Sequence, residues 1–340
     1  MSPFLFELLI DIVSRLTDPS RLFMCSKFMK SLNTPELQEV WLVRKHGRVA
    51  ALLRACHRGW DVQLVQRLMS GINDTVVVAR SLFIACRDGH AAIVQLLLLA
   101  APEVDVNGVF AGCTFLYKAC ENNRVEVVRL LLAAPGVDVN GVVDGGRSPL
   151  WVACQRDHAA VVRLLLTATG VDVNGATNGI GITPLHMACA GNHEEVARML
   201  LDTPGINVNA AAANGVTPLY LACAQNRTEV VRMLLDTPGI DVNAVAANGI
   251  TPLYAACAQN HTEVVRLLLS APGINVNAAA DDGLTPLHVA CGQNRTEVVR
   301  LLLDSPGIDV NAAAADGRTP IQLTDSPVIV GGLLNAGAHE

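Results

Sequence analysis

The sequence predicts an all-α fold, a solenoid of stacked helix-turn-helix units with a small helical segment at the N-terminal end. Seven cysteines recur at intervals of 34 or 35 residues, and such self-similarity is typical of repeat arrays. A Thr-Pro-Leu phrase or a variant of it leads up to each cysteine, and Val and Leu follow at helical spacing. The periodic cysteines are Cys86, Cys120, Cys154, Cys189, Cys223, Cys257 and Cys291.

The unit that starts at Thr217 shows how the first helix of a repeat arises. Thr217 is a good helix cap, and Pro218 suits the first helical position because its missing N–H would have no partner there. The sequence therefore predicts a short apolar helix over 218–224. Asn226 follows, and asparagine tolerates the left-handed conformation that ends a helix.

The second helix of the same unit is predicted over 228–235. Its Val and Leu side chains form one buried face, whereas Glu229 and Arg232 lie three residues apart on the exposed face. Pro238-Gly239 ends this helix, and Asn248-Gly249 predicts a turn before the next unit. The same exposed pairing recurs as Glu126/Arg129, Glu195/Arg198, Glu263/Arg266 and Glu297/Arg300.

One such unit cannot bury its own apolar faces, so a continuous core requires several stacked units with caps at the ends. We predict a helical N-terminal segment at 1–48 and a repeat array at 49–338. The array contains a degenerate cap at 49–76, seven full repeats at about 77–315 and a truncated C-terminal cap at 316–338. The full units start near Arg80, Thr114, Ser148, Thr183, Thr217, Thr251 and Thr285.

The repeated phrase resembles the ankyrin repeat, over about residues 50–338. It reads Thr285-Pro286-Leu287-His288, then Ala290-Cys291, then Glu297-Val298-Val299-Arg300-Leu301-Leu302-Leu303 and Gly307-Ile308-Asp309-Val310-Asn311. The period here is one residue longer than the usual period of about 33. The usual Gly-His between the helices is Asn-Arg or Asn-His, except at Gly89-His90. The resemblance implies a non-enzymatic module for protein–protein interaction, in which the histidines at 186 and 288 order a loop.

Composition and motifs argue against other functions. The net charge is −6, without a basic stripe, so we expect no nucleic-acid partner. The sequence has no apolar run of the length that a membrane span needs, and its apolar opening lacks the basic start of a signal peptide. We therefore expect no membrane partner and a location inside the cell, in the cytoplasm or the nucleus. We also expect the protein to be a monomer.

The side chains that could carry chemistry favour structural roles. Equivalent cysteines on neighbouring helices would lie about 8–10 Å apart, too far for a disulfide and without metal-ligand spacing. The sequence contains no phosphate-binding glycine loop and no Ser/His/Asp arrangement in the required context. We therefore predict no enzyme activity, no catalytic residue, no metal site and no cofactor.

In ankyrin proteins the loop tips and the outward side of the first helix line a concave groove, so the resemblance implies partner contacts at those positions. The early repeats vary more there than the later ones, which favours specificity in repeats two to four, counting the degenerate cap as the first; alternatively, the early repeats are drifted copies. The aromatic residues Tyr117, Trp151, Tyr220 and Tyr254 either form a stripe in the groove or pack as partly buried residues. The predicted partner-binding residues are Arg87, Asp88, Phe110, Glu121, Asn122, Asp144, Arg147, Gln155, Arg156, Gln225, Gln259, Asp281 and Asp282.

The first 48 residues resemble an F-box in Phe6–Leu16, Asp18-Pro19, Cys25–Lys30, Pro35-Glu36-Leu37 and Trp41. Leu5 stands where that family has a proline, and about one helical turn is missing before Cys25. The resemblance implies that the segment binds a Skp1-like adaptor and that the array is the substrate receptor of a ubiquitin ligase. The alternative is a scaffold or host-interaction protein in which the segment only caps the solenoid. The predicted adaptor contacts are Leu8, Leu9, Ile12, Leu16, Phe28 and Trp41.

Overall fold

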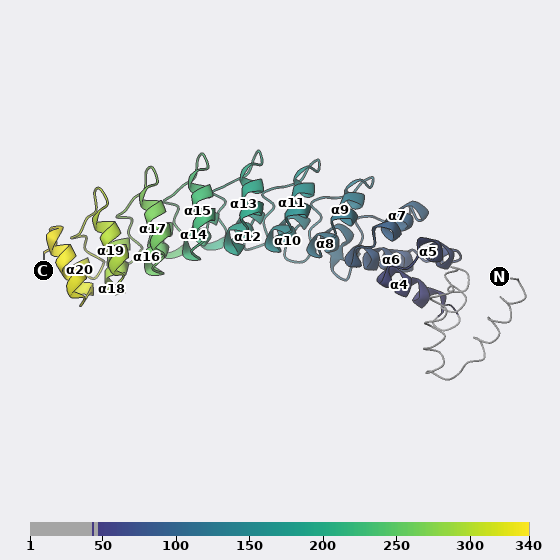
Figure 1. The fold of residues 1–340 in the computed structure, drawn as a ribbon, viewed down its shortest axis with the longest axis horizontal. Helices are drawn as coiled ribbons and strands as arrows, with labels where there is room; N and C mark the ends of the chain where they lie inside the picture. Colours follow the sequence, from purple (N-terminus) through teal and green to yellow (C-terminus); the bar gives the residue numbers. More distant parts are fainter. Residues whose placement is uncertain (1–42, 44–46, 340) are drawn as a thin grey trace, which may run out of the picture. The chain divides into compact units, whose positions relative to one another are not determined.

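The computed structural model describes residue 43 and residues 47–339 of the chain. These residues form 17 α-helices, three short 3-10 segments and one two-stranded hairpin (Figure 1). The chain divides into two compact units, of which one ends at Asp144 and the other begins at Gly145. The predicted all-α solenoid is confirmed, because helix pairs follow one another through both units.

The described part of the first unit contains three helix pairs and the hairpin. The hairpin is antiparallel and pairs Val109 with Thr114. Helix α6 starts earlier than the unit boundary predicted near Arg80, because the Asp74 side chain accepts hydrogen bonds from Val76 N and Val77 N and so caps the helix. The elements are α4 (Arg48–Arg58), α5 (Val62–Met69), α6 (Thr75–Asp88), α7 (Ala91–Ala100), β1 (Val109–Phe110), β2 (Cys113–Thr114), α8 (Phe115–Glu121) and α9 (Val125–Leu132).

In the second unit the first helices of successive repeats pack against one another, as α10 on α12 and α14 on α16, and the second helices form a second row (Figure 1). The elements are α10 (Pro149–Gln155), α11 (Ala159–Leu166), α12 (Pro184–Gly191), α13 (Glu194–Leu201), η1 (Ala213–Gly215), α14 (Pro218–Ala224), α15 (Thr228–Leu235), η2 (Ala247–Gly249), α16 (Pro252–Ala258), α17 (Thr262–Leu269), α18 (Pro286–Gly292), α19 (Thr296–Leu303), η3 (Pro320–Leu323) and α20 (Pro327–Asn335).

The predicted helix bounds in the unit at Thr217 are confirmed at both ends. Thr217 Oγ1 accepts a hydrogen bond from Tyr220 N at 3.2 Å, and Pro218 holds the first helical position. Asn226 has φ 57°, in the left-handed region, and it separates α14 from α15. Local sequence is therefore sufficient to set the bounds of α14.

The core lies between the two rows of helices. Leu253 and Cys257 of α16 and Val265 and Leu268 of α17 are fully buried, and the same positions are buried in the neighbouring repeats. Full burial of one such aliphatic side chain stabilises the fold by about 1.5–3 kcal/mol. The core is therefore one repeated layer of Leu, Val, Ala and Cys.

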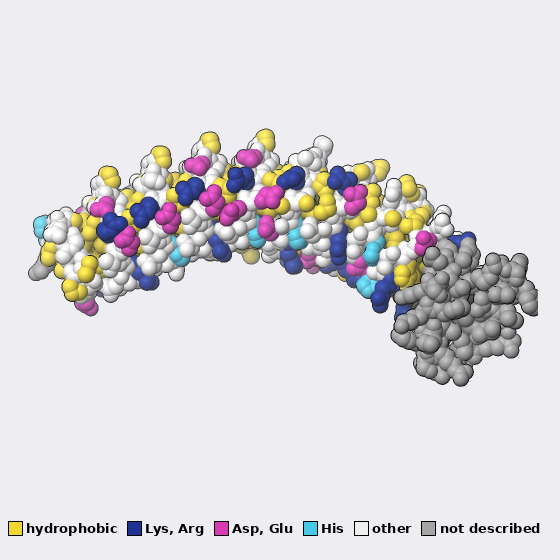
Figure 2. Space-filling view, in the orientation of Figure 1, with side chains coloured by type: hydrophobic (Ala, Val, Ile, Leu, Met, Phe, Trp, Pro, Cys, Tyr) yellow, Lys and Arg dark blue, Asp and Glu magenta, His cyan; other side chains and the backbone are white. Residues whose placement is uncertain are grey.

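The outward face of the second helices carries the predicted ion pairs, seen in Figure 2 as neighbouring basic and acidic side chains along the row. Arg266 Nε lies 3.3 Å from Glu263 Oε2, and Arg300 Nη2 lies 2.6 Å from Glu297 Oε1. Glu195 differs from the prediction, because its carboxylate pairs with Arg163 of the preceding repeat at 2.8 Å and not with Arg198. These exposed pairs contribute little to stability.

Candidate functional site

The thirteen predicted partner-binding residues all lie at the surface, in loop tips or at the ends of first helices. Eight are exposed: Asp144, Arg147, Gln155, Arg156, Gln225, Gln259, Asp281 and Asp282. Five are half-buried: Arg87, Asp88, Phe110, Glu121 and Asn122. The six predicted adaptor contacts, Leu8, Leu9, Ile12, Leu16, Phe28 and Trp41, lie outside the described residues.

In the first unit, several of these side chains are engaged with their own repeat. Phe110 packs on Phe83 with ring centroids 5.1 Å apart. Lys118 Nζ lies 2.6 Å from Glu121 Oε2, and Asn122 Nδ2 donates to the Lys118 carbonyl at 2.9 Å. These three candidates therefore offer a partner only part of their surface.

Arg87 and Asp88 form a charge cluster with His57 of the preceding repeat. Arg87 Nε and Nη2 donate to the two oxygens of Asp88 at 2.8 and 2.9 Å, and His57 Nδ1 lies 2.7 Å from Asp88 Oδ2. Burial alone would raise the pKa of Asp88, but the hydrogen bonds from Arg87 and His57 outweigh it and lower that pKa. The cluster therefore presents a fixed guanidinium and carboxylate at the end of α6.

In three repeats, the side chain at the third position of the first helix hydrogen-bonds to the loop that follows: Trp151, His186 and His288. His186 Nε2 lies 3.0 Å from Val216 O, and Trp151 Nε1 donates to Ile182 O at 3.1 Å. Tyr117 is only 4% exposed and Trp151 only 6%. Packing is therefore the role of Tyr117 and Trp151, whereas Tyr220 and Tyr254 are half-buried and reach the surface.

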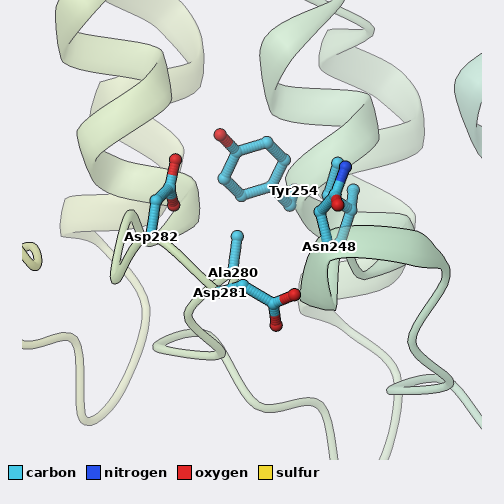
Figure 3. Close-up of a pocket in the computed structure, with 6 residues that line it drawn as sticks. Asn248, Tyr254, Ala280, Asp281 and Asp282 are labelled. Atoms are coloured by element: carbon cyan, nitrogen blue, oxygen red, sulfur yellow. The ribbon is translucent and has the colours of Figure 1, made fainter.

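A pocket of about 300 Å³ opens beside Tyr254. Asn248 and Ile250 line it from the loop tip before α16, and Ala280, Asp281 and Asp282 line it from the next loop tip, before α18 (Figure 3). The pocket joins two predicted residues, Asp281 and Asp282, to an aromatic residue that the sequence left unassigned. The sequence indicates that these residues are close, because stacking with a 34-residue period brings each loop tip beside the first helix that precedes it in the chain.

The last asparagine of the Asp-Val-Asn or Asn-Val-Asn phrase belongs to a ladder that was not predicted from the sequence. Asn243 Nδ2 donates to Gly273 O at 2.8 Å, and Asn243 Oδ1 accepts from Asn275 N at 2.8 Å. Asn209 bonds in the same way with Gly239 O and Asp241 N. The sequence pattern that indicates this ladder is an asparagine at the same position of every unit. We name this set the asparagine ladder; its members with these bonds are Asn107, Asn174, Asn209, Asn243, Asn277 and Asn311.

The periodic cysteines are buried free thiols. Burial raises the pKa of Cys291 to about 12 and raises the pKa of Cys257 even further, so neither forms a thiolate at neutral pH. Within residues 43 and 47–339, no group of three or more His, Cys, Asp or Glu side chains is placed to hold a metal ion. In the same part of the chain, no helix combines the length and apolar character of a membrane span.

The buried histidines at 186 and 288 predict a pH-dependent stability. Nδ1 of each accepts from the backbone N of its cap threonine at 3.1 Å, so the proton of the neutral ring is on Nε2. Burial lowers the pKa of both rings, although their hydrogen bonds to the carbonyls of Val216 and Arg318 oppose the shift. Because the folded-state pKa is below the unfolded value of about 6.5, protonation favours the unfolded chain. The free energy of unfolding should therefore fall as the pH drops from 7 to 5.

The double variant H186Q/H288Q tests this prediction by urea unfolding at pH 7, 6 and 5. Glutamine is compatible with the position, since Gln322 Oε1 accepts from Thr319 N at 3.1 Å in the last repeat. The variant should lose part of the decline in stability between pH 7 and pH 5, whereas a control variant, H339Q at an exposed histidine, should keep it. An unchanged decline in the double variant would assign the pH dependence to other groups.

Comparison with known proteins identifies a family and a similar solved structure. The family model for ankyrin repeats (3 copies) matches residues 52–142, 82–177, 150–246 and 238–314. A search of curated proteins found no match. Among solved structures, the ankyrin repeat domain of Bcl-3, which is described as a unique member of the IkappaB protein family, is 31% identical with a TM-score of 0.60. That similarity covers 66% of this chain and 99% of the Bcl-3 domain.

Proposed function

Because the chain belongs to the ankyrin repeat family, whose repeats are protein–protein interaction modules, we propose that it is a non-enzymatic receptor for a partner protein. The partner would contact the exposed loop tips and the ends of the first helices. The thirteen residues predicted from the sequence are the proposed contacts.

One observation supports the proposal above all: the core positions of successive repeats hold the same residue types, while the exposed ends of the first helices of the early repeats, α8 and α10, differ. The buried Cys120, Cys154 and Cys257 mark one core position. Next to that position, α8 ends in Glu121, which is followed by Asn122, and α10 ends in Gln155, which is followed by Arg156. Variation at these exposed positions supports a specific interface, because such an interface requires anchors of several types.

Site-specific crosslinking in cells tests the proposed contacts. A photoreactive amino acid at Gln155 or Gln259 should give crosslinks to a partner, because both side chains are exposed at the ends of first helices. The matched control is Arg232, on the outward face of α15. Crosslinks at Arg232 equal to those at Gln155 and Gln259 would show that the partner does not use the proposed contacts.

We further propose that residues 1–48 act as an F-box that binds a Skp1-like adaptor, which would make the array the substrate receptor of a ubiquitin ligase. The F-box-like residues of that segment support this role. Lysine is also rare in the array, where Lys118 is the only one after Lys45, and its ammonium group is paired with Glu121. A receptor poor in lysine would be a poor target of its own ligase. The role fits the predicted cytoplasmic or nuclear location.

Affinity capture separates this role from a simple cap. The full-length protein and a truncated chain that begins at Arg48 should be captured in parallel and probed for Skp1 and a cullin. Capture of both by the full-length protein alone supports the ligase role. Absence of both, together with an insoluble truncated chain, would instead assign residues 1–48 to capping the solenoid.

A further inference from the structure

We propose that the pocket beside Tyr254 binds an arginine side chain of the partner protein. This inference rests on the proposed function and specifies the chemistry of one contact. The pocket is formed by two successive loop tips and the helix between them, since Asn248 and Ile250 precede α16, Tyr254 lies on α16, and Ala280, Asp281 and Asp282 precede α18. Its volume of about 300 Å³ is at the lower limit of small-molecule sites, which suits one side chain.

The pocket combines an aromatic ring with two carboxylates. In Figure 3, Asp282 and Asn248 flank the Tyr254 side chain, and Asp281 lies below it with its carboxylate turned toward the η2 segment. Gly249 permits this approach, because a Cβ at that position would lie 2.8 Å from Asp281 Oδ1. Asp281 N also donates to Asn248 O at 2.8 Å, which fixes the two loop tips against each other.

The two carboxylates have no cationic partner among the described residues. Asp282 Oδ1 accepts from Leu284 N at 3.1 Å, a bond that holds the loop without neutralising the charge. By contrast, the nearby Asp316 carboxylate is paired with Arg318 Nε at 2.6 Å. Burial and the charge of Asp282 raise the pKa of Tyr254, so the phenol stays neutral at physiological pH. The pocket therefore carries uncompensated negative charge.

Arginine fits these groups better than lysine does. The planar guanidinium can stack on an aromatic face and donate to carboxylates in a fixed fork, and it is less strongly hydrated than an ammonium group. The Tyr254 ring supplies the face, and Asp281 and Asp282 supply the acceptors. A lysine ammonium would gain the charge attraction without the stacking.

The preceding repeat provides an internal control. Tyr220 of α14 occupies the place that Tyr254 occupies in α16, 34 residues later. The loop tip that follows Tyr220 has Ala247 and Asn248 where the loop tip that follows Tyr254 has Asp281 and Asp282. The two sites thus share a half-buried phenol and differ in the carboxylates. The proposal therefore predicts that an added arginine side chain affects Tyr254 and leaves Tyr220 unchanged.

Fluorine NMR of protein labelled with 3-fluorotyrosine measures both sites at once, because the chain has 3 tyrosines. Y220F and Y254F assign the resonances. The probes are the blocked tripeptides Gly-Arg-Gly, Gly-Lys-Gly and Gly-citrulline-Gly, added at constant ionic strength and at pH 6.5. Citrulline is the matched control because it keeps the shape of arginine without its charge.

We expect the arginine peptide to move the Tyr254 resonance with an initial slope roughly fivefold that of the citrulline peptide, with the lysine peptide between them and Tyr220 unaffected. D281N/D282N should remove the difference between arginine and citrulline, and the amide that replaces the second carboxylate still offers an oxygen to Leu284 N, which preserves the loop. Equal slopes for arginine and citrulline, or a larger response to lysine, would overturn the proposal. The crosslinking experiment remains independent, because it reports partner contact at Gln155 and Gln259 whatever this pocket binds.

Discussion

The substitution Leu253→Ala is expected to lower the free energy of unfolding by about 2–5 kcal/mol, the range for removing a fully buried leucine. Leu253 has no exposed surface, and its helix α16 packs against both α14 and α18. The cavity would thus weaken two repeat interfaces at once. Because repeats interact only with their neighbours, the unfolding transition should also broaden. Urea unfolding followed by circular dichroism measures both effects.

Val245→Ala is the control for that experiment. Val245 is 57% exposed in a loop tip, so its truncation should change the free energy of unfolding by no more than about 0.5 kcal/mol. A comparable loss in both variants would mean that chain-wide effects, and not burial in α16, determine the cost. A loss below about 1 kcal/mol for Leu253→Ala would mean that the neighbouring helices close around the cavity.

Asn243→Ala is expected to cost about 1–2 kcal/mol, since it removes two hydrogen bonds that each contribute about 1 kcal/mol. Asn243 Nδ2 donates to Gly273 O, and Asn243 Oδ1 accepts from Asn275 N. Asn243→Asp is the sharper variant, because a carboxylate still accepts from Asn275 N and cannot donate to Gly273 O. In urea unfolding, the parent protein with Asn243 should have a larger free energy of unfolding than either variant.

Gln259→Ala is the matched control for the asparagine ladder. Gln259 carries the same amide group, lies exposed at the end of α16 and has no side-chain hydrogen bond among the described residues. Its replacement should leave the free energy of unfolding within about 0.5 kcal/mol of the parent. If Asn243→Asp were as stable as the parent, the bond to Gly273 O would be shown to contribute nothing.

Local sequence was sufficient to predict the helix bounds in a repeat that carries the Thr-Pro pair. Thr217 and Pro218 begin a helix, as the same pair does in other repeats, and Asn226 ends it in the left-handed conformation, so the bounds of α14 could be predicted without knowledge of the neighbours. The start of α6 was missed because that repeat has no Thr-Pro. Its cap is Asp74, which lies six residues before Arg80, the position that aligns with the cap threonine of the other units.

The contacts between repeats could not be predicted in the same way. Whether Glu195 pairs with Arg198 or with Arg163 depends on the distance between two second helices, which no single repeat contains. The same holds for the pocket, since Tyr254 and Asp282 are far apart in sequence and become neighbours through stacking. The periodicity shows that they are close, but the direction of each side chain follows from the packed structure.

The asparagine ladder also bears on how such a chain can change in length. Asn209, Asn243 and Asn277 each reach a glycine carbonyl 30 residues further on. An in-frame duplication or deletion of one period in the gene would therefore still supply each of these amides with its carbonyl. At the far end, Asn311 bonds with Gly337 O and His339 N, so an insertion there would have to replace bonds that already exist. Recombination within the array should thus be tolerated more readily than growth at its C-terminal edge.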